Sequence, residues 1–154
     1  MTIGDAQKAY DIAYAIAEKA HAGQFRKAPD NRPYFEHCKD VAAMMPTLEL
    51  KTVALLHDVI EDTTVTAQDL LAAGIPNPIV DAVVAMTKPE GATDYLAYVK
   101  SHVLPNEMAR KVKLADNYVN LKDRLAAIIA GGPEAEYARR KVEEYVGSIQ
   151  VLLG

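Results

Sequence analysis

The chain has 154 residues, with 17 Lys and Arg against 21 Asp and Glu, a net charge of −4, and half of its residues hydrophobic. Its apolar runs are far shorter than the roughly 20 residues that a membrane-spanning helix needs, and its acidic balance opposes sequence-independent binding to DNA or RNA. We therefore expect neither a membrane nor a nucleic-acid polymer as partner.

Alanine-rich stretches with apolar residues three or four positions apart recur along the chain, whereas alternating β-branched residues are nearly absent. This pattern predicts an all-α fold. Because repeats, low-complexity tracts and linker-like segments are missing, we expect residues 1–154 to form a single domain. The first ten residues, MTIGDAQKAY, lack the basic flank and apolar stretch of a signal peptide, so we expect a cytoplasmic protein.

Glycines, prolines and capping residues divide the chain into predicted helices. The first covers about residues 3–22 and ends at Gly23, and a loop with two prolines follows over about residues 24–34. Thr47 and Thr66 are candidate N-caps, and Gly131 and Gly132 end the longest helix. The later helices are predicted at about 36–45, 48–61, 66–74, 78–87, 94–102, 106–130 and 133–152.

The most informative stretch is LLHDVIEDTT, residues 55–64, most of which falls in the helix predicted at 48–61. Because positions four apart share a helix face, we expect His57 beneath Glu61 and Asp58 beneath Asp62. Removing three carboxylates and an imidazole from water is costly unless a counter-charge offsets it, and a divalent cation is an efficient one. A solvated acidic helix end is the alternative interpretation.

Two more polar residues lie among apolar neighbours elsewhere. His37 precedes core-like residues, although taken alone it would be a hydrogen-bonded core histidine. Asp116 lies in the middle of the longest helix, where an aspartate is locally unfavourable and therefore suggests a use. With His57 and Asp58 they would make a mixed imidazole and carboxylate set, which suits manganese, iron or zinc rather than calcium. The lone cysteine, Cys38, allows neither an internal disulfide nor a cysteine-built zinc site.

The order of a histidine, an adjacent His-Asp pair and a distant aspartate resembles the HD phosphohydrolase superfamily. Over about residues 10–125, six blocks resemble in order the hydrolase domain of the RelA/SpoT alarmone enzymes. The blocks are HAGQFRK from His21, Pro33-Tyr34 with His37, Val41-Ala42, LHDVIEDT from Leu56, Met86-Thr87-Lys88, and Lys113-Leu114-Ala115-Asp116 with Asn120. Because 154 residues leave no room for a synthetase domain, the chain is most similar to the stand-alone small alarmone hydrolases.

The resemblance implies a single HD-domain helical bundle that uses Mn²⁺, or another divalent transition metal, to hydrolyse guanosine tetra- or pentaphosphate. The products would be GDP or GTP and the 3′-pyrophosphate. Carried over by position, the metal ligands would be His37, His57, Asp58 and Asp116, and the catalytic carboxylates Glu61 and Asp62. A cation activates water and withdraws phosphoryl charge, while a carboxylate one helical turn away can orient the water or accept its proton.

The resemblance also implies residues that bind the nucleotide. Arg26 would stack on the guanine, Lys27 would lie near the nucleotide, and Asn120 would contact the base. An exposed basic loop is the other interpretation of Arg26 and Lys27. Lys88 and Lys113 are candidates for phosphate contacts, with solvent-facing lysines as an equal alternative. We expect the tyrosines, Tyr34 beside the site and those at 95, 98, 137 and 145, to pack.

Two departures from the family's pattern leave the choice of nucleotide open. Asn117 stands where a basic residue is usual, which we expect to weaken the hold on a highly charged substrate, and Tyr118-Val119 replaces the usual pair before the asparagine. Two alternatives therefore remain. One is an HD-type phosphatase acting on another nucleotide, such as a dNMP or the 2′-phosphate of NADPH. The other is a metal-free module that senses the alarmone without cleaving it.

Overall fold

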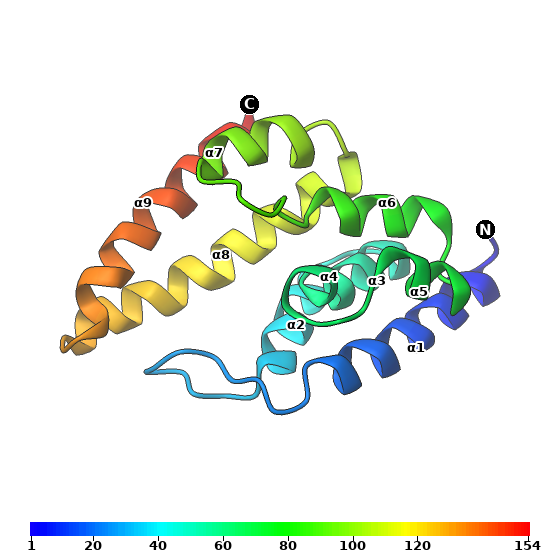
Figure 1. Ribbon diagram of the computed structural model, residues 1–154, viewed down its shortest axis with the longest axis horizontal. Coiled ribbons are helices and arrows are strands. Elements are labelled where there is room, and N and C mark those ends of the chain that lie inside the picture. Colours follow the sequence, from blue (N-terminus) through cyan, green and yellow to red (C-terminus); the bar gives the residue numbers. More distant parts are fainter.

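The computed structural model describes residues 1–154 and is built from helices, with one isolated antiparallel bridge between Phe25 and Pro33 (Figure 1). This confirms the all-α prediction. None of the helices combines the length and apolarity that crossing a bilayer requires. In chain order the elements are α1 (Ile3–Ala20), α2 (Tyr34–Ala43), α3 (Leu48–Leu56), α4 (Val59–Asp62), α5 (Ala67–Ala72), α6 (Asn77–Ala85), α7 (Tyr95–Tyr98), the π-helical turn η1 (Val99–Val103), α8 (Glu107–Ala130) and α9 (Glu134–Leu153).

Helix α3 is the centre of the fold. Leu50 and every residue from Thr52 to Leu56 are buried, and α1, α2, α6 and α8 all pack against α3. The second half of α3 is apolar apart from Thr52, and such a segment must be surrounded by other helices in this way. The chain therefore emerges from α3, at His57 and Asp58, in the interior of the molecule.

Helices α8 and α9 form a long antiparallel pair that extends to one side of the other helices (Figure 1). Asn106 caps α8 through a hydrogen bond to the Ala109 amide, and Gly131 ends it with φ 72°, a backbone angle that favours glycine. The first half of α8 also contacts the α2 and α3 bundle, where Val112 and Val119 join the core. Polar residues on α8 can thus face both the bundle and α9.

The predicted helix over residues 48–61 is wrong in one respect, because it breaks at His57 and Asp58. In a continuous helix the Ala54 carbonyl would accept the Asp58 amide. Instead the His57 ring donates from Nδ1 to the Ala54 oxygen at 2.6 Å, and α4 starts only at Val59. A hydrogen bond from the Asp62 amide to the Asp58 carbonyl at 3.0 Å still keeps one helical turn between these two residues.

Smaller differences concern the other helices. The predicted helix over 94–102 is helical along its length, but it changes from α7 to the wider turn η1 at Val99. The predicted caps are confirmed, since Thr47 accepts the Leu50 amide and Thr66 forms a reciprocal capping box with Asp69.

Candidate metal centre

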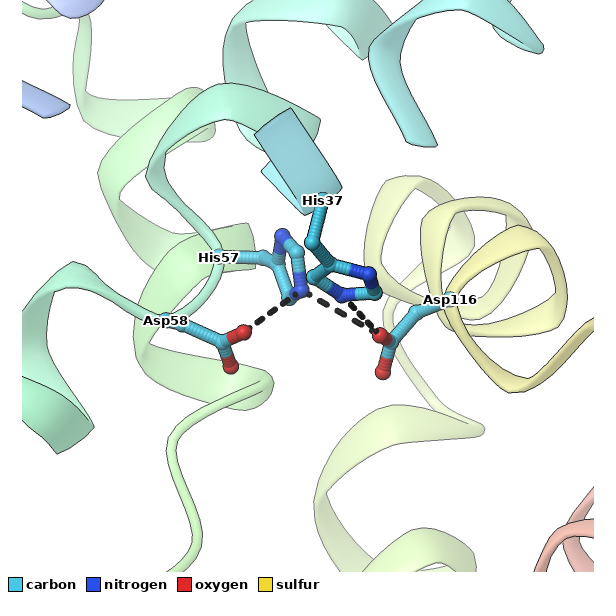
Figure 2. A group of neighbouring side chains, drawn as sticks. All are labelled: His37, His57, Asp58 and Asp116. Atoms are coloured by element: carbon cyan, nitrogen blue, oxygen red, sulfur yellow. Dashed lines mark hydrogen bonds and ion pairs between the residues drawn. The ribbon is translucent and has the colours of Figure 1, made fainter. Parts of the chain in front are cut away.

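Four polar side chains from three parts of the fold point toward one another (Figure 2). Helix α2 supplies His37, the break after α3 supplies His57 and Asp58, and α8 supplies Asp116. Each offers one nitrogen or oxygen atom, and these four atoms all lie within 4.8 Å of one another. The four residues that the sequence singles out as metal ligands are therefore brought together, as a mixed set of two imidazoles and two carboxylates.

The contacts within this cluster are short, and three of its four side chains are buried, while Asp58 is partly exposed. His57 Nε2 lies 2.9 Å from Asp58 Oδ2 and 3.3 Å from Asp116 Oδ1, and His37 Nε2 lies 2.9 Å from the same Asp116 oxygen. His37 and His57 are each 1% exposed and Asp116 is 3% exposed. Burying two carboxylates in this way is unfavourable unless a cation sits among them.

The orientation of the His57 ring supports this conclusion. Its Nδ1–H donates to the Ala54 carbonyl, so in the neutral ring Nε2 presents a lone pair to two carboxylates. Burial lowers the pKa of His57, but the charges of Asp58 and Asp116 outweigh it and raise that pKa well above the usual value. The cluster thus attracts a cation, which can be a proton or a metal ion, and a ring whose second nitrogen is fixed by a carbonyl is well prepared as a metal ligand.

His37 complements this arrangement. Burial lowers the pKa of its imidazole, despite the opposing contact with Asp116, so the ring is neutral as a ligand must be. Its Nδ1 is buried without a hydrogen-bond partner. The donor set of this cluster therefore fits a divalent transition metal.

Three further side chains hold the carboxylates of the cluster in place. The Tyr34 hydroxyl donates to Asp58 Oδ2 at 2.5 Å, which gives this tyrosine a polar role beyond packing. Asn120 Nδ2 donates to Asp116 Oδ1, and Lys113 Nζ contacts Asp116 Oδ2, each at 2.9 Å.

Lys113 is only 9% exposed, so the solvent-facing alternative for this lysine is wrong. Burial opposes the ionisation of Asp116, yet Lys113 and His57 lower its pKa well below the usual value.

A cavity of roughly 200 Å³ opens beside the cluster. Its walls contain both predicted catalytic carboxylates, several lysines and four tyrosines. The lining residues are Arg26, Tyr34, Asp58, Glu61, Asp62, Lys88, Tyr95, Tyr98, Lys113, Asp116, Asn120, Lys141 and Tyr145. Lys141 was not expected here, and Tyr95, Tyr98 and Tyr145 were expected only to pack. Lys141 and Tyr145 lie four residues apart and share a face of α9, but the sequence does not say which helix that face meets.

Glu61 and Asp62 differ in their surroundings. Glu61 Oε1 accepts the backbone N–H of Lys88 at 2.7 Å, which fixes the carboxylate at the cavity. Asp62 is exposed as a residue, but partial desolvation of its carboxylate raises its pKa to about 6, and the charges of Asp58 and Glu61 raise it further. Asp62 can therefore exchange a proton near neutral pH, as a general base must.

Arg26 lies beside this cavity and is fixed rather than mobile. Its Nη2 donates to Asn120 Oδ1 at 2.7 Å and to Asp123 Oδ2 at 2.8 Å, and its side chain is 10% exposed. Its guanidinium carbon lies 5.6 Å from the centre of the Tyr34 ring. The alternative of an exposed basic loop is therefore wrong for Arg26. Lys27 is exposed, with Nζ 4.4 Å from the centre of the Tyr137 ring.

A second cavity, also of roughly 200 Å³, adjoins the first. Its walls are Phe25, Arg26, Lys27, Tyr34, Asn120, Arg124, Tyr137 and Tyr145. Arg26, Tyr34, Asn120 and Tyr145 line both cavities, which makes them neighbouring parts of one cleft. Arg124 and Tyr137 are additions that the sequence did not identify.

Asn117, the departure next to Asp116, does not face the cluster. It is fully buried, donating from Nδ2 to Ser148 Oγ at 2.6 Å and accepting from the Tyr95 hydroxyl at 3.1 Å. Its side chain therefore joins α8 to α9 and α7. The expectation that Asn117 weakens substrate binding by removing a cation beside the cluster is not supported by this location.

Several curated proteins match the chain in sequence. No family model matches the chain. GTP pyrophosphokinase rsh of Brucella suis biovar 1 is 34% identical over 144 residues, which is 86% of this chain and 18% of the relative. The bifunctional (p)ppGpp synthase/hydrolase SpoT of Escherichia coli K12 is 44% identical over 62 residues, 38% of this chain and 8% of the relative. The chain thus spans less than a fifth of the length of these curated relatives.

A solved structure described as a metazoan orthologue of SpoT that hydrolyses ppGpp superposes with a TM-score of 0.79 at 22% identity. The superposition covers 95% of this chain and 86% of the other, so the two share a fold. The sequence matches, taken by themselves, make the chain similar to a segment of the longer rsh and SpoT proteins.

Proposed function

We propose that this chain is a metal-dependent phosphohydrolase that removes the 3′-pyrophosphate of guanosine tetra- or pentaphosphate, giving GDP or GTP. The observation that carries the proposal is the buried His and Asp cluster at the wall of a cavity that also holds two carboxylates and three lysines. Homology adds the substrate class. A relative from Escherichia coli O157:H7, 44% identical over 62 residues, is named guanosine-3′,5′-bis(diphosphate) 3′-pyrophosphohydrolase.

The metal in this proposal is Mn²⁺, held by His37, His57, Asp58 and Asp116. Two imidazoles and two carboxylates suit Mn²⁺ better than Ca²⁺, and the unsatisfied lone pair of His57 supports a cation at this point. When bound, such an ion supplies Lewis-acid stabilisation of phosphoryl charge and activation of water.

The residues around the cluster would then have separate roles in catalysis and phosphate binding. Asp62, whose pKa is about 6, accepts the proton of the attacking water, and Glu61 orients that water from the position in which the Lys88 amide holds it. Lys88, Lys113 and Lys141 surround the phosphates with positive charge.

The second cavity would receive the rest of the nucleotide. Arg26 offers a planar guanidinium fixed by two hydrogen bonds, Asn120 lies between the two cavities, and Lys27 lies at the outer edge. Residues 1–154 would act as one domain, since a single core cluster of 28 residues draws on nearly all the helices. We place the activity in the cytoplasm, where a guanine nucleotide substrate is found.

A substrate panel tests the proposal. The EDTA-treated protein, reloaded with Mn²⁺, is given guanosine tetraphosphate, guanosine pentaphosphate, a dNMP set and NADPH, and the products are separated by ion exchange. We expect GDP or GTP with pyrophosphate from the first two substrates and little turnover of the others. Faster release of inorganic phosphate from a dNMP or NADPH would overturn the proposal. So would tight alarmone binding without cleavage, which is the behaviour of a sensing module.

A further inference from the structure

The guanidinium of Arg124 lies inside the protein without a partner. The residue is 4% exposed, and its Nη1 is buried with no hydrogen-bond partner. The carboxylate of the preceding Asp123 is paired with Arg26 instead, at 2.8 Å. A guanidinium carries five N–H donors, and burying its Nη1 without a hydrogen-bond partner is unfavourable. Such an arrangement indicates that a ligand completes the site.

The cavity that Arg124 lines has the character of a site for a flat ring. Four of its eight lining residues are aromatic, namely Phe25, Tyr34, Tyr137 and Tyr145. Rings and guanidinium planes offer stacking faces to a planar ligand. The lysines suited to phosphate, Lys88, Lys113 and Lys141, line the other cavity.

Arg124 is also placed at a fixed distance from the cluster. Asp116, Asn120 and Arg124 follow one another at intervals of four along α8 and so share one face of that helix. Eight residues of helix advance about 12 Å. A nucleotide with its 3′-phosphate group at the cluster would therefore extend past Asn120 and bring its base toward Arg124.

We propose that Arg124 is a specificity-determining residue that donates two parallel hydrogen bonds to O6 and N7 of a guanine or hypoxanthine base. The inference rests on the proposed function in that a nucleotide is held at the cluster. O6 and N7 are adjacent acceptors that match the paired donors of a guanidinium, whereas adenine replaces O6 with an amino donor. Arg124 would thus favour guanosine and inosine nucleotides over adenosine nucleotides.

The test compares wild type, Arg124→Met and Arg124→Lys with 3′,5′-bis(diphosphates) of guanosine, inosine and adenosine. Initial rates give kcat and KM, and calorimetry with GDP, IDP and ADP gives affinities that do not depend on cleavage. We expect wild type to prefer guanosine and inosine over adenosine by about 10- to 100-fold. Arg124→Met should lose this preference through KM, with affinity for ADP nearly unchanged. Arg124→Lys should lose most of it too, because it keeps the charge but not the paired donors.

Arg140→Met serves as the matched control, since Arg140 has a side chain 69% exposed on α9 and lines neither cavity. Equal weakening of GDP and ADP by Arg124→Met would overturn the inference and indicate a phosphate contact. An unchanged preference for guanosine in a folded Arg124→Met variant would also overturn the inference. If the Met variant does not fold, the comparison is made with Arg124→Lys.

The two proposals fail separately. If wild type binds GDP over ADP through Arg124 but cleaves none of the bis(diphosphates), the proposed hydrolysis is wrong and the role of Arg124 stands. If wild type cleaves guanosine tetraphosphate with no preference for its base, the role of Arg124 is wrong and the hydrolysis stands.

Discussion

Asp58 and Glu61 lie within one helical turn of each other, yet they make different contacts. The Asp58 carboxylate faces His57 inside the cluster, and the Glu61 carboxylate accepts the Lys88 amide at the edge of the cavity. We expect Asp58→Ala to lose both the metal and the activity. Glu61→Gln keeps an oxygen that can accept the Lys88 amide, so it should retain the metal while turnover falls by about 100-fold or more.

Elemental analysis after gel filtration in Mn²⁺, with initial rates on the same samples, separates these outcomes. Equal loss of metal from both variants would mean that Glu61 is a ligand rather than a catalyst. Glu49→Gln, at a partly exposed position in the first turn of α3 and outside the cluster and both cavities, is a matched control that should change neither quantity.

Asp62 gives a pH-dependent prediction. Its pKa is raised from 3.8 to about 6 in the fold, first by burial and then by Asp58 and Glu61. A carboxyl group with a raised pKa binds its proton more tightly when folded, so its contribution to stability is present below about pH 4 and is lost as the pH rises to about 6. Asp62→Asn should therefore unfold at higher urea than wild type above pH 6 and equally at pH 3.5 to 4.

Because Asp62 is exposed, solvent screening limits this gain to at most about 1 kcal/mol. Urea titrations of the metal-free protein in EDTA, from pH 3.5 to pH 8, measure it. A difference in stability that does not vary with pH would show that the pKa of Asp62 is not shifted.

At the scale of the helices, one buried hydrogen-bond chain joins α7, α8 and α9. Tyr95 donates to Asn117, and Asn117 donates to Ser148, with Asn117 and Ser148 fully buried. We expect Asn117→Ala to lower the free energy of unfolding by about 2 kcal/mol, because it leaves the Tyr95 and Ser148 hydroxyls without partners.

Ser148→Ala should lower the free energy of unfolding by less than Asn117→Ala does, because it interrupts only one of the two hydrogen bonds. Urea unfolding of both variants and of the double variant measures the coupling, and the double variant should be about as stable as Asn117→Ala alone. If the losses of stability in the two single variants simply add up in the double variant, the two hydrogen bonds do not act as one chain. The loss in Asn117→Ala would then come from packing.

The bounds of the helices could largely be read from local signals, whereas the break in one of them could not. Thr47 and Thr66 cap their own helices and Gly131 ends another, and each acts within a few residues of its position. The break after Leu56 depends on the His57 ring capturing the Ala54 carbonyl. In the rotamer that makes this bond, the other ring nitrogen faces Asp58, the next residue in the chain, and Asp116 of the distant helix α8. Periodicity, which assumes regular backbone bonding, therefore predicted an unbroken helix.

At the scale of the whole molecule, the burial of charged side chains could not be predicted from residue type. The sequence leaves Lys113 equally suited to a phosphate contact or a solvent-facing position and does not single out Arg124, yet both are buried because α8 lies between the bundle and α9. Asp116 can be singled out from the sequence, because a carboxylate among apolar neighbours in a helix is locally unfavourable. The grouping of residues as distant as His37 and Asp116, 79 positions apart, was expected from family resemblance. The spacing along the sequence predicts proximity only among the polar residues from 57 to 62.

This cluster joins three segments of the fold, and that makes metal binding and stability interdependent. A metal that binds only the folded chain adds RT ln(1 + [metal]/Kd) to the free energy of unfolding, about 2.7 kcal/mol at a hundredfold excess over Kd. For a domain of this size that raises Tm by roughly 5 to 10 °C. We expect Mn²⁺ to produce such a rise in EDTA-treated protein and Ca²⁺ to produce far less, because Ca²⁺ binds poorly to imidazole.

Scanning calorimetry with and without Mn²⁺ measures this rise, and His37→Ala is the decisive variant. Removing the His37 ring deletes one of four ligands and the only one that α2 supplies, so the Mn²⁺-dependent rise in Tm should shrink by more than half whatever the Tm of the metal-free variant. Arg140→Met, at a side chain that is 69% exposed and lines neither cavity, should keep the full rise. The same rise in His37→Ala as in wild type would place the stabilising ion elsewhere, most simply among Asp58, Glu61 and Asp62, the other group of acidic side chains close enough to share one.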